Sequence, residues 1–92
     1  MEGYKFILIS NQLRFGYGYR TVDGNKEYFA FHGSPSRNDD YFVNVEITSD
    51  EFEKIAREYP RQINVNRDEA EIFRKKYDEG HRVILEGWNR LL

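Results

Sequence analysis

The residues best suited to acid–base or nucleophilic chemistry lie around His32. A polar loop follows this histidine and holds two serines, Ser34 and Ser36, and two aspartates, Asp39 and Asp40. A histidine that takes the proton of a serine hydroxyl is a common way to make a nucleophile. Most small domains contain these residue types close together, however, and no spacing here matches a catalytic motif. We therefore expect the protein not to be an enzyme.

The sequence carries no motif for a cofactor or a metal ion. Gly16 and Gly18 flank a tyrosine, but a phosphate-binding loop needs wider glycine spacing, a Lys-Ser or Lys-Thr end and a following helix. The adjacent carboxylates of Asp39 and Asp40 cannot enclose a cation, and calcium-loop spacing is missing. The chain has no cysteine, which excludes a disulfide scaffold, a thiol nucleophile and a thiolate zinc site. We expect no cofactor and no metal.

Aromatic residues and arginines are the remaining chemical feature. The 92 residues include seven Phe, seven Tyr and one Trp, which is enough to close a small core because each aromatic buries ~150–250 Å². Tyr, Phe and Arg are also enriched where proteins bind one another. The densest combination is Phe-Gly-Tyr-Gly-Tyr-Arg over residues 15–20. Whether these residues form the core or a binding surface depends on the strands and helices that carry them.

The N-terminal half is predicted to form strands, because it is rich in aromatic and β-branched residues and is divided by turn residues. In the second of these strands Tyr17 and Tyr19 alternate with glycines, which places the tyrosines on one face. The predicted strands are Tyr4–Ile9, Leu13–Val22, Lys26–His32 and Tyr41–Ile47.

A tight hairpin is predicted between the second and third strands. Asp23-Gly24-Asn25 supplies the positive φ angles that a two-residue turn needs. With a two-residue loop at either position, Phe29 and Phe31 lie on the same face as the glycines of the second strand, opposite the Tyr-rich face. A three-residue loop with a bulge would break this parity.

The C-terminal half is predicted to be helical. Thr48 and Glu51 form a capping box at the start of the first helix, and Pro60 ends it. Residues 61–65 form a short linker or edge strand. Asn66 and Glu69 repeat the capping pattern, and an apolar stripe then continues to the C-terminus with a weak point at Gly80. A break of the helix at this glycine is one alternative, and a fifth strand over residues 81–85 is another.

These elements predict one α+β domain over residues 1–92. It consists of a four-stranded antiparallel meander followed by two C-terminal helices packed on one face, the second helix broken at Gly80 in one alternative. Helices on one side leave the other face of the sheet open. The open surface is then a partner-binding site, whereas the competing interpretation places the aromatics in the core. The predicted partner-binding residues are Arg14, Tyr17, Tyr19, Arg20, Phe29 and Phe31.

Charge and length narrow the choice of partner. The net charge is −2 and the pI is about 5.7, so no overall basic field attracts nucleic acid or an anionic membrane. The apolar stretch Phe6–Ile9 is too short for a signal peptide or a membrane span. The absence of cysteine suits a reducing compartment. We expect a cytoplasmic protein that does not bind a membrane.

The predicted function is a small non-enzymatic protein-binding module that acts by occupying a partner protein. Accessory, immunity, anti-defence, inhibitor and regulatory proteins have this general profile, so the inference comes from the profile and not from a motif. A homodimer formed through the sheet is a second way to use the same surface. The alternative function is single-stranded nucleic-acid binding, in which bases stack on the strand aromatics and arginines neutralise phosphates.

Overall fold

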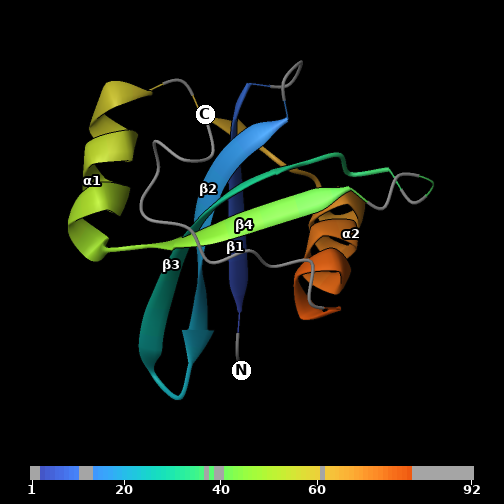
Figure 1. Ribbon diagram of the computed structural model, residues 1–92, viewed down its shortest axis with the longest axis horizontal. Coiled ribbons are helices and arrows are strands. Elements are labelled where there is room, and N and C mark those ends of the chain that lie inside the picture. The colour runs from blue at the N-terminus through green and yellow to red at the C-terminus, as the bar shows by residue number, and fades with distance from the viewer. Residues whose placement is uncertain (1–2, 11–13, 37, 39–40, 61, 80–92) are drawn as a thin grey trace.

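The computed structural model describes residues 3–10, 14–36, 38, 41–60 and 62–79. Within them the chain forms strands β1 to β5 and helices α1 and α2 (Figure 1). The strands are β1 Tyr4–Ser10, β2 Phe15–Val22, β3 Asn25–Gly33, β4 Phe42–Ile47 and β5 Ile63–Asn64. The helices are α1 Ser49–Glu58 and α2 Arg67–Asp78. The strands make one antiparallel sheet in the order β4-β3-β2-β1-β5.

The predicted fold class is confirmed. Strands β1 to β4 form an antiparallel meander in chain order, and two helices follow, as expected for an α+β fold. Strand β5 comes from the segment predicted to be a linker or edge strand, and it pairs with β1 at one end of the sheet. The question of a break at Gly80 or a strand over residues 81–85 lies outside the described residues.

The β2–β3 hairpin has the predicted two-residue turn. Val22 pairs with Asn25, and the two residues between them have positive φ angles, 51° at Asp23 and 81° at Gly24. Positive φ at both central positions is the requirement of a type I′ turn. Gly16 therefore lies opposite Phe31, which confirms the predicted parity of the two strands.

Replacement of Gly24 by alanine tests this turn. A Cβ at φ 81° is strained in the left-handed region, so Gly24→Ala is expected to lower the free energy of unfolding by about 1 kcal/mol. Gly3→Ala is the matched control, because a Cβ there meets no atom within 4 Å and no backbone strain is added. Urea denaturation of both variants gives the comparison. Equal stabilities would contradict the turn assignment.

Both helices begin with the predicted capping boxes. Thr48 Oγ1 accepts a hydrogen bond from the Glu51 backbone N–H at 3.1 Å, and Glu51 Oε1 accepts one from the Thr48 N–H at 2.9 Å. Asn66 and Glu69 make the same reciprocal pair at α2. Each box satisfies two backbone donors that a helix start leaves unpaired.

The two helices pack on opposite faces of the sheet, so the prediction that both pack on one face is wrong. Figure 1 shows α1 on one side and α2 on the other. Ile55 of α1 packs with Ile7, Tyr17 and other residues of one face. Phe73 and Tyr77 of α2 pack on the opposite face, with Phe6 of β1 among others. Each face of the sheet is apolar, and each helix covers one of them.

Candidate functional site

Three of the six predicted partner-binding residues lie in the core. Tyr17, Phe29 and Phe31 each have 0% of their surface exposed. The prediction that they form an open recognition surface is therefore wrong. A homodimer through the aromatic face of the sheet loses its support for the same reason, because the chain's own helices cover both faces.

Phe29 and Phe31 are covered by α2. The ring centroid of Phe73 lies 5.0 Å from that of Phe31, and the centroid of Tyr77 lies 5.0 Å from that of Phe29. On the strand side, Gly16 lets Phe31 approach closely, since a Cβ at this glycine would lie 2.5 Å from Phe31 Cζ. The aromatic-over-glycine arrangement is thus present, but it fills the core.

Tyr17 is covered by α1. Its ring makes an edge contact with Phe52, with centroids 5.2 Å apart. The buried hydroxyl accepts a hydrogen bond from Gln62 Nε2 at 3.0 Å. Burial raises the pKa of Tyr17, and the bond from Gln62 offsets part of this rise. The hydroxyl is accommodated by a local partner and is not presented to solvent.

The other three predicted residues are half-buried and lie at opposite ends of β2. Arg14 precedes the strand with a positive φ of 58°, and its carbonyl oxygen accepts a hydrogen bond from the Gly33 N–H at 3.1 Å. Tyr19 and Arg20 lie toward the hairpin end, where the ammonium of Lys26 is 4.5 Å from the Tyr19 ring centroid. The structure does not bring Arg14 and Arg20 into one site.

Arg20 is held firmly at the hairpin end. Its Nη2 donates to Glu27 Oε2 at 2.5 Å, and its guanidinium lies 5.2 Å from the Tyr77 ring centroid. Burial lowers the pKa of Arg20, but hydrogen bonds with Tyr4 and Glu27 raise it, and the net pKa lies above its ordinary value. Arg20 therefore remains a cation at any physiological pH.

The edges of the described sheet differ in accessibility. β4 ends the strand order, yet Asn44 and Val45 have 0% exposed surface. This edge therefore offers no open backbone at those positions for a partner strand. β5 at the other edge is only two residues long, and Ile63 is 40% exposed. A short edge strand limits unwanted strand pairing.

Among the described residues, the aromatic ring that is exposed, Tyr41, belongs to a cluster of rings at the Phe15 end of the sheet. Phe15 and His32 are a cross-strand pair whose rings stack, with centroids 4.4 Å apart and an interplanar angle of 22°. Tyr41 meets His32 at 80°, with centroids 5.2 Å apart. His32 Nδ1 lies 3.2 Å from Tyr41 Oη. We call Phe15, His32 and Tyr41 the aromatic ladder.

The ladder combines half-buried rings with one that faces solvent. Tyr41 is 53% exposed, and Phe15 and His32 are half-buried. The strand alternation already placed Phe15 and His32 on one face. It did not show that this cross-strand row, Phe15 with His32, is less covered by α1 than the neighbouring row that contains Tyr17. The polar contact of His32 is with Tyr41, whereas Ser34 Oγ accepts from the Ser36 N–H. Within the described part of this loop, the geometry does not assemble a histidine–serine nucleophile.

Comparison of the chain with protein-family models, curated proteins and solved structures finds no match. Among the described residues, neither helix has the length and apolar character needed to cross a membrane.

Proposed function

We propose that this protein is a non-enzymatic protein-binding module and that the aromatic ladder is its contact surface. The observation that carries the proposal is the exposure of Tyr41, which is 53%, beside two ordered half-buried rings. Of the six partner-binding residues predicted from the sequence, Arg14 lies beside the ladder, because its carbonyl oxygen accepts a hydrogen bond from the N–H of Gly33, the residue after His32. The protein would act by occupying its partner, as accessory, regulatory or inhibitory proteins do.

The ladder favours binding because its rings are already positioned. Cross-strand pairing fixes Phe15 against His32, and the edge contact with His32 restrains Tyr41. A side chain that is ordered before binding loses little conformational entropy when a partner packs on it. Tyrosine adds apolar area together with a hydroxyl for hydrogen bonding, which explains its frequency among residues that dominate binding energy.

Removal of the Tyr41 ring tests the proposed surface. In co-purification of the full chain with its partner from host extract, followed by an affinity measurement on that partner, Tyr41→Ala is expected to weaken binding at least about tenfold. The folded state should be retained, because the side chain is exposed.

Ile63→Ala is the control for this experiment, because Ile63 is also apolar and exposed but lies on β5, at the far edge of the sheet. Affinity should not change in the control. An unchanged affinity in Tyr41→Ala, or an equal loss in both variants, would remove the ladder from the proposal.

Single-stranded nucleic-acid binding is the second candidate function. The observation in its favour is the same stack of rings, because bases bind to aromatic faces regardless of sequence, with Arg14 next to Phe15 in the chain. The two functions differ in salt dependence. Binding to a single strand weakens linearly on a log–log plot against salt concentration, whereas binding through aromatic contacts changes little. Fluorescence titration with an oligonucleotide at several salt concentrations separates them.

A further inference from the structure

A groove runs between the sheet and one side of α2. Tyr4 and Arg20 line it from the sheet, and Ala70, Glu71, Arg74 and Asp78 line it from the helix. Its volume is about 670 Å³, inside the range of about 300–1,000 Å³ found for small-ligand sites. It also includes Gly3, where an added Cβ would meet no atom within 4 Å. The groove is open at that position.

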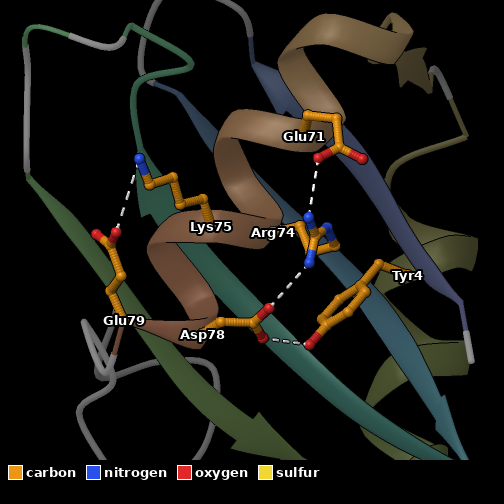
Figure 2. Close-up of polar contacts among 6 residues, drawn as sticks. All are labelled: Tyr4, Glu71, Arg74, Lys75, Asp78 and Glu79. Carbon is orange, nitrogen blue, oxygen red and sulfur yellow. Dashed lines mark hydrogen bonds and ion pairs between the residues drawn. The ribbon is translucent and has the colours of Figure 1, made fainter.

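In the groove, the side chain of Arg74 forms ion pairs with two carboxylates. Figure 2 shows its guanidinium between two carboxylates, with Nη2 3.0 Å from Glu71 Oε2 and Nη1 3.2 Å from Asp78 Oδ2. All three side chains are about half exposed. Such surface pairs contribute little to stability because water screens them. Arg74 therefore loses little when one carboxylate replaces another.

The sheet side of the groove is fixed. The Tyr4 hydroxyl donates to Asp78 Oδ1 at 2.5 Å, and Figure 2 shows the ring directed toward that carboxylate. The Tyr4 ring also stacks on Phe6, with centroids 5.8 Å apart, and meets Tyr77 edge-on. Arg20 is held by Glu27. The groove thus has a rigid aromatic wall opposite a helix face whose ion pairs can exchange.

We propose that this groove binds a zwitterionic ligand of the α-amino acid class. The ligand carboxylate takes one of the two hydrogen-bonding positions on Arg74, and the displaced Glu71 or Asp78 carboxylate binds the ligand ammonium. The described residues of the lining include two cationic and two anionic side chains, so a neutral zwitterion preserves their charge balance, and the exchange replaces the two ion pairs of Arg74 with three. An apolar ligand side chain packs on the Tyr4 ring and Ala70.

This site is independent of the aromatic ladder. Arg20 and Phe15 lie near opposite ends of β2, a separation of roughly 17 Å at about 3.3 Å per residue. Loss of function at one site therefore leaves the other intact, and the failure of either proposal is distinguishable from the failure of the other.

Titration of the full ¹⁵N-labelled chain tests the proposal with three probes. L-phenylalanine carries both charged groups, its N-acetyl derivative lacks the ammonium, and its amide lacks the carboxylate. L-phenylalanine is expected to shift the backbone amide signals of Tyr4 and Ala70 in a saturable way. Each derivative is expected to bind about two- to fivefold more weakly, because one half of the ion-pair exchange is missing and water screens an exposed ion pair.

Arg74→Gln is expected to weaken binding of L-phenylalanine about two- to fivefold. Arg57→Gln on α1 is the control, since Arg57 is an exposed helical arginine away from the groove, and it should bind as the unchanged protein does. The remaining amide signals report whether each variant is folded. Equal affinities for the three probes, equal affinity in Arg74→Gln, shifts centred on Phe15 and His32, or no saturation up to the solubility limit would each overturn the proposal.

Discussion

Phe31→Ala is expected to lower the free energy of unfolding by about 3–5 kcal/mol, the usual cost of removing a large side chain from a core. Phe31 has no exposed surface, and its ring contacts Phe6, Phe42 and Phe73 at centroid distances of 5.7, 5.7 and 5.0 Å. The loss is a large part of the stability of a chain of 92 residues, since about 0.05–0.15 kcal/mol per residue is typical.

Chemical denaturation gives the stability change, and a double-mutant cycle with Phe73→Ala shows whether α2 supplies the contact. Residues in contact couple by about 0.5–3 kcal/mol, whereas distant residues are nearly additive. Phe15→Ala is the matched control, because Phe15 is half-buried on the opposite face, and its loss should be smaller. Additive effects of Phe31→Ala and Phe73→Ala would contradict the placement of α2 over this face.

Asn44→Val is expected to raise the free energy of unfolding by about 1–3 kcal/mol, the cost of leaving a buried polar group without a partner. Asn44 pairs with Phe31 across the β3–β4 ladder and has 0% exposed surface. Within the described part of the chain, its Nδ2 and Oδ1 have no hydrogen-bond partner. Valine also has a higher preference for strands.

The midpoint of urea unfolding measures this gain. Asn64→Val on β5 serves as the control, because Asn64 is also a strand asparagine but is exposed, so water already satisfies its amide. A stability change there within about 0.5 kcal/mol is expected. A clear destabilisation in Asn44→Val would show that the buried amide makes hydrogen bonds in the folded protein.

Local features of the fold were predictable because short-range chemistry determines them. The Asp-Gly turn set the register of β2 and β3 and therefore the face of Phe31. The Thr48–Glu51 pair marked the start of α1, because both reciprocal bonds depend only on residues three apart. Such features need no knowledge of the rest of the molecule.

The assignment of helices to faces was not predictable from the helices themselves. An amphipathic stripe shows that a helix buries one side, but not which side of a sheet receives it. The strand β1 did carry a signal, since Phe6-Ile7-Leu8-Ile9 is apolar without alternation, and such a run is typical of a strand buried on both faces. Phe6 and Leu8 indeed pack toward α2, and Ile7 packs toward α1.

The exposure of the candidate site depends on where each helix packs on the sheet, which the sequence patterns did not show. Phe52 of α1 contacts Tyr17, Tyr19 and Tyr28, and this coverage is what leaves the Phe15–His32 row as the more accessible part of the same face. The extent to which a helix covers a strand row follows from its length and docking position. Neither property is encoded in the alternation of a strand.

The opposite placement of the helices has a consequence for biosynthesis. Ribosomes release a chain from its N-terminus, so β1 to β4 emerge first and α1 follows directly at Ser49, whereas α2 starts only at Arg67. Until that point, Phe6, Phe29 and Phe31 lack the helix that shields them in the finished fold. A nascent or cleaved chain ending between the helices would display this aromatic layer, and chaperones and proteases that recognise exposed apolar surface would distinguish unfinished molecules from complete ones.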